Sequence, residues 1–251
     1  MDLQIVYYAI DEALYAASRY FQVAVPAFLV FYWVLRRPMA KRKIQSANPT
    51  WSKMMSEIIL SMISVGIFGL VAAVSFNVLG DMNHVYRQWD ELGAAYYFLS
   101  FFLVLFLHDT YFYWIHRLMH TRFLYRHVHA VHHRSTNPTP WTAYSFHPLE
   151  ALLEAGILPL IAFGLPVHYS VVVICMLAQI IYNVYAHLGY ELYPRGFHRT
   201  SVGRYINTSV AHNQHHSRFH GNYGLYFLVW DRLMGTLRRD YDQGFERVGR
   251  R

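Results

Sequence analysis

Long apolar stretches dominate the hydrophobic pattern of this chain. Windows of about 20 residues, the length needed to cross a bilayer of roughly 30 Å, mark a first span at 20–35, a second at 58–79 and a third from 94 to about 114. Two further stretches, 149–167 and 169–185, follow one another closely. They predict either a tight pair of spans or a hairpin that dips in from one side. We expect an all-α integral-membrane bundle with about four to five apolar spans.

The distribution of basic residues predicts how these spans are oriented. The loop after the first span has five Lys and Arg residues within 36–43, whereas Arg87 is the only one in the loop before the third span. Cytoplasmic loops are enriched in Lys and Arg. The first loop is therefore predicted to be cytoplasmic and residues 1–14 to lie on the other side. Residues 116–148 and 188–251 then form a cytoplasmic helical cap on a multi-pass protein, in the inner membrane if the protein is bacterial.

The composition supports a membrane protein and argues against nucleic acid as a partner. The chain is 55% hydrophobic and only 15% charged, which is unlike an ordinary soluble domain. The net charge of +7 fits basic flanks beside membrane lipids, and the basic residues are not interleaved as a nucleic-acid surface. A single cysteine, Cys175, excludes an intrachain disulfide and a thiolate metal site. Without repeats or a linker, residues 1–251 are interpreted as one domain.

The 16 histidines are concentrated in short runs. Residues 116–120 read HRLMH, residues 129–133 read HAVHH and residues 212–216 read HNQHH. On a helix, each of these spacings places its imidazoles on one face. A helix at the end of the third span, followed by two that double back, could therefore bring eight imidazoles together. His127 lies off the predicted face of the second run, and we expect it outside the cluster.

Imidazoles at this spacing indicate a transition-metal site. A structural zinc is complete with four ligands and a catalytic zinc with three plus water, so eight imidazoles suggest two metal ions. A membrane zinc hydrolase is an alternative, but it needs fewer ligands and a carboxylate base, and the chain has no HExxH motif. A metal transporter is less favoured, because its ligands should lie near the middle of the bilayer.

The longer sequence around these runs resembles a known superfamily. The segments are HDTYFYWIHRLMH, HAVHH followed by STNPTPWTAYSFHPLE, then HLGYE, HNQHH and NYGLYFLVWDRLMGT. Together they resemble the fatty acid hydroxylase and sterol desaturase superfamily, integral-membrane non-haem di-iron oxygenases, over about residues 100–237. The resemblance implies a di-iron centre whose catalytic metal ligands are His116, His120, His129, His132, His133, His187, His212, His215 and His216.

The resemblance also implies a reaction. Two iron ions, for which zinc is a possible substitute, would use O2 to hydroxylate or desaturate a C–H bond of a lipid such as a sterol, a fatty acyl chain or a sphingoid or aminolipid. The chain has no haem-binding or iron–sulfur motif of its own. Electrons are therefore expected from an external donor, such as a cytochrome b5-like protein, a ferredoxin or a reductase.

Other polar residues near the histidine runs are candidates for supporting roles. Metal-bound imidazoles usually donate their second N–H to an acceptor, and three carboxylates are candidates for it: Asp109, Glu150 and Asp231. His108 lies deeper in the third span and is expected to line the approach to the metals. His147 is interpreted as a residue that supports a metal ligand and does not itself bind the metal. Glu191 occupies a position where some relatives carry histidine, and its role as a ligand is left open.

Overall fold

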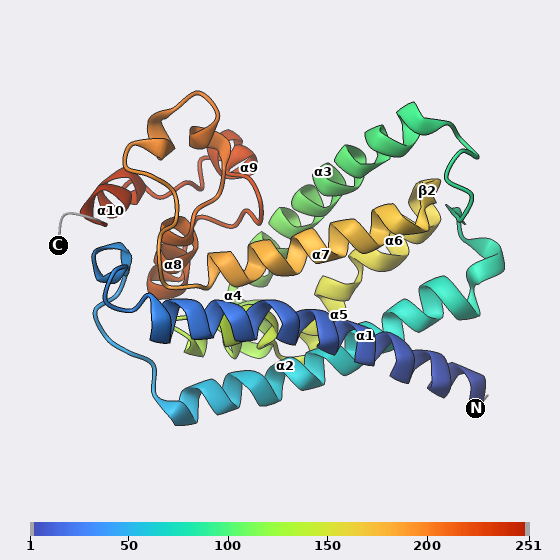
Figure 1. Ribbon diagram of the computed structural model, residues 1–251, viewed down its shortest axis with the longest axis horizontal. Coiled ribbons are helices and arrows are strands. Elements are labelled where there is room, and N and C mark those ends of the chain that lie inside the picture. Colours follow the sequence, from blue (N-terminus) through green and yellow to red (C-terminus); the bar gives the residue numbers. More distant parts are fainter. Residues whose placement is uncertain (1–2, 249–251) are drawn as a thin grey trace.

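Four long helices form a membrane bundle (Figure 1). The structure is a computed structural model, and it describes residues 3–248. Within that range, the helices long and apolar enough to cross a membrane are four: Leu3–Val34, Trp51–Val78, Ala94–Met119 and Tyr169–Ala186. The first consists of α1 (Leu3–Phe28) and the π-helical η1 (Leu29–Val34), the second of α2 (Trp51–Ala72) and the π-helical η3 (Ala73–Val78), and the others are α3 and α7. The predicted all-α membrane bundle is confirmed.

The apolar stretch at 149–167 does not form a further span. It contains two helices of eight residues, α5 (Pro148–Ala155) and α6 (Ile157–Gly164), each about 12 Å long. Pro159 has no N–H to offer the carbonyl of Ala155, so one continuous helix is unfavourable here. The chain then reaches α7 through β2 (Val167–His168), which pairs in parallel with β1 (Val85–Tyr86). Of the alternatives predicted for 149–185, a pair of full spans is therefore not formed.

Helix α1 begins earlier than the sequence pattern predicted, because its N-terminal half packs along α2. A Cβ atom built on Gly69 would lie 2.6 Å from atoms of Ala13, so the two backbones approach as closely as small residues allow. Near the end of η3, Asn77 donates a hydrogen bond of 3.2 Å to Glu12. The segment before residue 20 is thus part of the bundle and not a separate tail.

The segment after the second histidine run lies inside this bundle. The short 3-10 helix η7 (Pro140–Tyr144) follows that run and contacts α1 and α7. Tyr20 donates a hydrogen bond of 2.9 Å to the carbonyl of Trp141 and stacks on Tyr144. Asn183 of α7 donates one of 2.7 Å to the carbonyl of Ala143. These contacts fix the ends of both α7 and the histidine-bearing segment.

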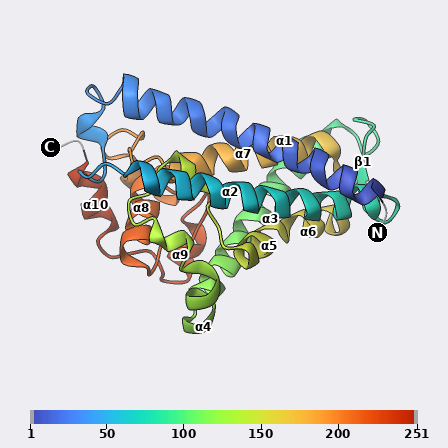
Figure 2. The ribbon, with the colours of Figure 1, turned by 90° about the horizontal axis from the view of Figure 1, so that it is seen from below.

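The remaining elements are short, and many of them gather at one end of the long helices. Figure 1 shows α8, α9 and α10 at the end opposite the N-terminus, and Figure 2 shows α4 projecting at the end of α3. Their bounds are η2 Ala40–Arg42, η4 Gly80–Met82, α4 Arg122–Leu124, η5 Tyr125–His129, η6 His132–Arg134, η8 Phe197–Arg199, η9 Gly203–Tyr205, α8 Ser209–Arg218, α9 Val229–Leu233 and α10 Tyr241–Arg247. All nine predicted ligand histidines lie in or beside this cap, where α3 and α7 end.

Candidate metal centre

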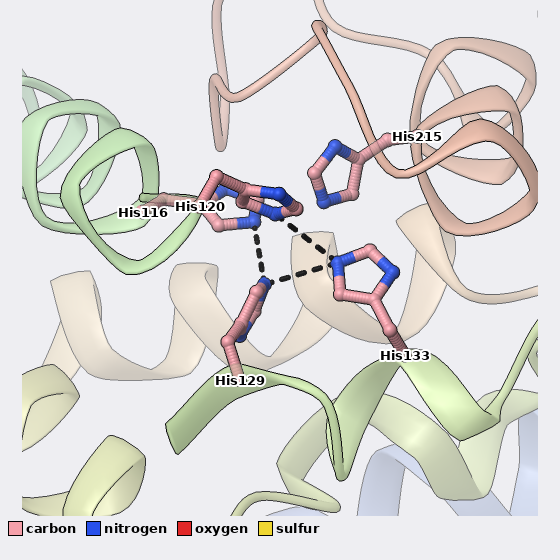
Figure 3. A group of neighbouring side chains, drawn as sticks. All are labelled: His116, His120, His129, His133 and His215. Atoms are coloured by element: carbon pink, nitrogen blue, oxygen red, sulfur yellow. Dashed lines mark hydrogen bonds between the residues drawn. The ribbon is translucent and has the colours of Figure 1, made fainter. Parts of the chain in front are cut away.

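One group of imidazoles forms where α3 ends against the cap. His116 and His120 come from the last turn of α3, His129 and His133 from the segment after α4, and His215 from α8, as Figure 3 shows. Each offers a ring nitrogen, and these nitrogens all lie within 4.8 Å of one another. Four of the five side chains are buried, and His120 is partly exposed. Five convergent imidazole nitrogens could hold a metal ion.

A second group lies next to the first. His132, His187, His212 and His216 also offer ring nitrogens within 4.8 Å of one another, and all four are buried. The shortest contact, between Nε2 atoms of His212 and His187, is 2.9 Å. The two groups adjoin, since the rings of His132 and His129 are 5.4 Å apart and those of His215 and His216 are 5.8 Å apart. The structure thus brings together all nine histidines that the sequence singled out.

Each of the two three-histidine runs divides between the two groups, which the helical interpretation did not specify. In both runs the first and last members (i, i+4) join one group and the middle member joins the other. The second run is also not a regular α-helix, because η5 is π-helical, a turn follows and η6 is a 3-10 helix. Yet the third run lies in the regular α-helix α8 and divides in the same way. The exposed ring of His127 bonds the carbonyl of Phe123 and lies outside both groups, as expected.

Backbone carbonyls determine which nitrogen of several rings is protonated. The Nδ1 atoms of His116 and His215 lie 2.9 and 2.8 Å from the carbonyls of Tyr223 and Gly221. The Nδ1 atoms of His132 and His187 lie 3.2 and 2.8 Å from the carbonyls of Ser145 and Asn183. A carbonyl oxygen can only accept, so Nδ1 must carry the proton in these rings and Nε2 keeps its lone pair. Carbonyls that accept from the outer ring nitrogen in this way orient the metal-binding histidines of proteins.

The lone pairs of several Nε2 atoms converge, and this arrangement fits a bound cation. Nε2 of His132 and Nε2 of His187 are 3.4 Å apart, yet neither can donate to the other while Nδ1 holds the proton. Nε2 of His215 is buried without a hydrogen-bond partner. Buried polar atoms in this condition are costly. A metal ion among these nitrogens would satisfy them, so the donor set fits a transition-metal site.

Burial keeps these imidazoles neutral, the form that binds metal. Loss of hydration lowers the pKa of His187 to about 4 and that of His120 to about 2, with neighbouring imidazoles adding to the effect at His120. The same cause holds the pKa of the buried imidazoles of the second and third runs well below their ordinary value. At neutral pH the rings are therefore available as ligands.

Glu150 is the one predicted carboxylate that contacts a ligand imidazole. Its Oε1 lies 2.7 Å from Nδ1 of His129, and both side chains are buried. Burial disfavours charge on both partners, because it raises the pKa of the carboxyl and lowers that of the imidazole. The contact therefore carries one shared proton and fixes the ring of His129.

The other two carboxylates hold a loop instead of an imidazole. Asp109 accepts from the backbone N–H groups of Tyr226 and Phe227 at 2.8 and 3.1 Å. Asp231 accepts from the N–H groups of Tyr223 and Gly224 at 2.9 and 2.8 Å. Backbone N–H groups compete for these carboxylates because the loop at 220–227 folds tightly between α8 and α3. Since Tyr223 supplies the carbonyl for His116, Asp231 acts on the metal centre through the loop.

Three further candidates lie outside the two groups. His147 caps α5 by accepting from the N–H of Leu149 at 3.2 Å, so it does not contact a ligand. Glu191 is buried and accepts from Tyr185 Oη and from the N–H of Val210, which ties α7 to the start of α8. His108 is buried, and its Nδ1 lies 3.2 Å from Tyr226 Oη. Sequence reasoning missed the carbonyl acceptors altogether, and Gly221, with φ of +79°, was a sequence signal of a special backbone there.

A largely apolar cavity lies between the membrane helices, with His108 among its lining residues. Its lining on α7 runs from Tyr169 to Asn183, about 21 Å along the helix. At one end, the rings of Phe146 and Phe112 lie 5.0 and 5.1 Å from those of His132 and His116. No imidazole of the two groups is among the lining residues, so these two rings lie between the cavity and His132 and His116.

Comparisons with known proteins agree on one family. The model of the fatty acid hydroxylase family matches residues 101–236. Lathosterol oxidase of Rattus norvegicus is 33% identical over 168 residues, 65% of this chain and 54% of the relative. A Delta(7)-sterol 5(6)-desaturase of Gibberella zeae is 32% identical over 158 residues, 63% of this chain and 43% of the relative.

Neither relative is matched over its whole length. The chain spans about half the length of these curated relatives. No solved structure matches. Because the family model covers more than half of the chain and includes every imidazole of the two groups, the protein belongs to the fatty acid hydroxylase family, within the fatty acid hydroxylase and sterol desaturase superfamily.

Proposed function

We propose that the protein is a membrane-bound di-iron oxygenase that hydroxylates or desaturates a C–H bond of a lipid. The observation that carries the proposal is the convergence of nine imidazole nitrogens in two adjoining groups, with Nε2 lone pairs aimed at one another. Four and five ligands per group exceed what one catalytic zinc requires. Family membership and the sterol-oxidising names of the relatives favour redox chemistry over hydrolysis.

Different residues of this chain have separate roles in such a reaction. Two iron ions and O2, when bound, supply an oxidant that no side chain can provide. His116, His120, His129, His133 and His215 would hold one ion, and His132, His187, His212 and His216 the other. The carbonyls of Tyr223, Gly221, Ser145 and Asn183, together with Glu150, orient the rings. Phe112 and Phe146 keep the cavity end apolar and exclude water.

The substrate is proposed to be a lipid that enters the cavity from the membrane. The cavity lies between membrane helices and is mostly apolar, and the relatives are named for sterol substrates. Hydroxylation and desaturation remain alternatives within the proposal, because both begin with removal of hydrogen from the same carbon. The placement of that carbon against the two imidazole groups would decide between them.

Orientation and electron supply complete the proposal. The basic loop at 36–43 lies at the same end of the bundle as the histidines, since Arg42 contacts the carbonyls of Glu191 and Tyr193. Basic loops favour the cytoplasm, so we assign the metal centre to the cytoplasmic side. An external electron donor, such as a cytochrome b5-like protein, a ferredoxin or a reductase, would then approach the cap from that side.

Metal analysis and O2 uptake test this function directly. The protein purified from iron-supplemented cells should contain two irons per chain and should consume a reductant in an O2-dependent manner. His132→Ala should lose iron and uptake, whereas His127→Ala, on an exposed ring outside both groups, should keep both. Lipidomics of cells with each variant would give the product, with one added oxygen for hydroxylation or two fewer hydrogens for desaturation. A protein with one zinc per chain and no redox activity would contradict the proposal.

A further inference from the structure

Among the charged side chains that line the cavity, Arg19 is the only cation. We propose that Arg19 binds an anionic oxygen group of the substrate inside this cavity, so that the substrate is an acidic lipid with a carboxylate or a phosphate. This inference rests on the proposed function, because it assumes that the cavity is the lipid site. It adds a specificity-determining residue that lies outside the histidine centre.

Arg19 occupies a part of the bundle where a charge needs a partner. It lies on α1, near the middle of the candidate span Leu3–Val34. Its Nε is buried and has no hydrogen-bond partner, and its guanidinium lies 4.5 Å above the ring of Tyr15. An ionisable residue within a membrane helix usually marks a functional site, because hydrocarbon does not solvate it.

No carboxylate of the described residues compensates Arg19. Two acidic residues line the same cavity, but neither forms an ion pair with it. Glu12 lies seven residues earlier on the same helix, about 10 Å along the axis, and accepts from Asn77. Glu154 lines the cavity from α5, a different helix. The guanidinium therefore retains donors for a ligand.

The neighbours of Arg19 also favour a group that accepts hydrogen bonds. Tyr144 Oη donates to Gln179 Oε1 at 2.8 Å, which leaves the amide N–H groups of Gln179 as donors. Burial raises the pKa of Tyr144 to about 12, and the nearby charge of Arg19 opposes that rise. Arg19, Tyr144 and Gln179 all line the cavity. A carboxylate or phosphate would accept from Arg19 and Gln179, and guanidinium is well suited to such anions.

The position suits a polar group held between the cavity opening and the metal centre. Tyr15 lines the cavity and is 41% exposed, so the cavity opens toward the surface at this side of α1. Gln179 lies one turn before Asn183, which accepts from the ligand His187. An anion at Arg19 would anchor the lipid while its chain extends past Phe146 and Phe112.

Equilibrium binding of four probes tests the proposal. The full chain with its metal, reconstituted in phosphatidylcholine nanodiscs without reductant, is titrated with radiolabelled oleic acid, oleyl phosphate, oleyl alcohol and cholesterol. We expect oleate or oleyl phosphate to bind at least tenfold more tightly than oleyl alcohol, and the stronger of the two identifies the anion. Arg19→Gln should abolish the preference, Arg19→Lys should keep part of it, and Arg37→Gln, on an exposed residue beyond the same helix, should change nothing.

The outcomes separate this inference from the proposed function. Equal affinity of the wild type for oleate and oleyl alcohol would overturn it, and this comparison needs no variant to fold. It would also fail if Arg19→Gln kept the preference, or if cholesterol bound most tightly with or without Arg19. Iron content and O2 uptake are measured independently, so a di-iron oxygenase with a neutral substrate would remain possible after any of these results.

Discussion

At the scale of single residues, the proton on Nδ1 decides what the imidazoles can bind. Spacing identified eight histidines, because helical periodicity places residues i, i+3 and i+4 near one another, and the family resemblance added His187. Spacing could not identify the partners of His116 or His187, since these are backbone carbonyls of Tyr223 and Asn183 and carry no residue signature. Asp109 and Asp231 were recognised as important carboxylates, but their contacts depend on how the loop at 220–227 folds.

Glu150 provides a test at this scale. Removing the outer partner of a metal-binding histidine typically lowers metal affinity 10- to 100-fold, so Glu150→Ala should weaken iron binding by about that factor. Glu150→Gln keeps an oxygen that can accept from His129 Nδ1 and should have an intermediate effect. Iron per chain after titration with a chelator gives the affinities, and Asp81→Ala, an exposed carboxylate, is the control. Wild-type affinity in Glu150→Ala would show that this contact does not support the metal.

At the scale of helices, the apolar pattern predicted the existence of the spans better than their ends. The first span was expected from residue 20, yet α1 begins at Leu3, because residues before 20 are less apolar and are held by contact with α2. The stretch at 149–167 was apolar enough for a span, but Pro159 and the turn at Gly156 divide it. Hydropathy records how apolar a segment is, and packing decides where its helices begin and break.

Two glycines on α2 give a matched test of that packing. A Cβ atom at Gly69 would lie 2.6 Å from Ala13, whereas one at Gly66 would meet nothing within 4 Å. Gly69→Ala forces α1 and α2 apart and should lower the free energy of unfolding by about 1 to 3 kcal/mol. Gly66→Ala should be neutral or stabilise by up to about 1 kcal/mol, because alanine has the higher helix propensity. Denaturant titration in mixed micelles compares them, and equal effects would contradict the close approach of the two helices.

At the scale of the whole molecule, the histidine centre joins segments that are far apart in the sequence. Ligand candidates come from the end of α3, the segment after α4, the end of α7 and α8. The sequence pattern predicted that these segments meet, but not that each three-histidine run divides between two groups. That division also occurs in the regular α-helix α8, where His215 joins one group and His212 and His216 join the other, so it depends on which neighbouring rings each imidazole meets in the folded chain. Because the cap buries these imidazoles as neutral rings, its folding depends on pH.

This link predicts how the stability of the metal-free protein depends on pH. Burial lowers the pKa of His187 to about 4 and holds the pKa of the other buried cap imidazoles well below 6.5, whereas in the unfolded chain each titrates near 6.5. Below that value the unfolded state binds more protons, so stability is complete above about pH 7 and falls as the pH drops. Each imidazole contributes about 1.4 kcal/mol per pH unit within this window.

The midpoint of thermal unfolding of the chelator-treated protein, measured from pH 7.5 to 5.0 in detergent, should therefore drop steeply below pH 6.5. Replacing the exposed His127 by alanine should leave this dependence unchanged, because its ring lies outside the buried groups. Added iron should raise the midpoint at neutral pH, since an ion that binds only the folded state stabilises it, and acid should reverse the gain as protons compete for Nε2. A midpoint that stays constant across this pH range would mean that the imidazoles are not buried as neutral rings, and the two groups would then need a different arrangement.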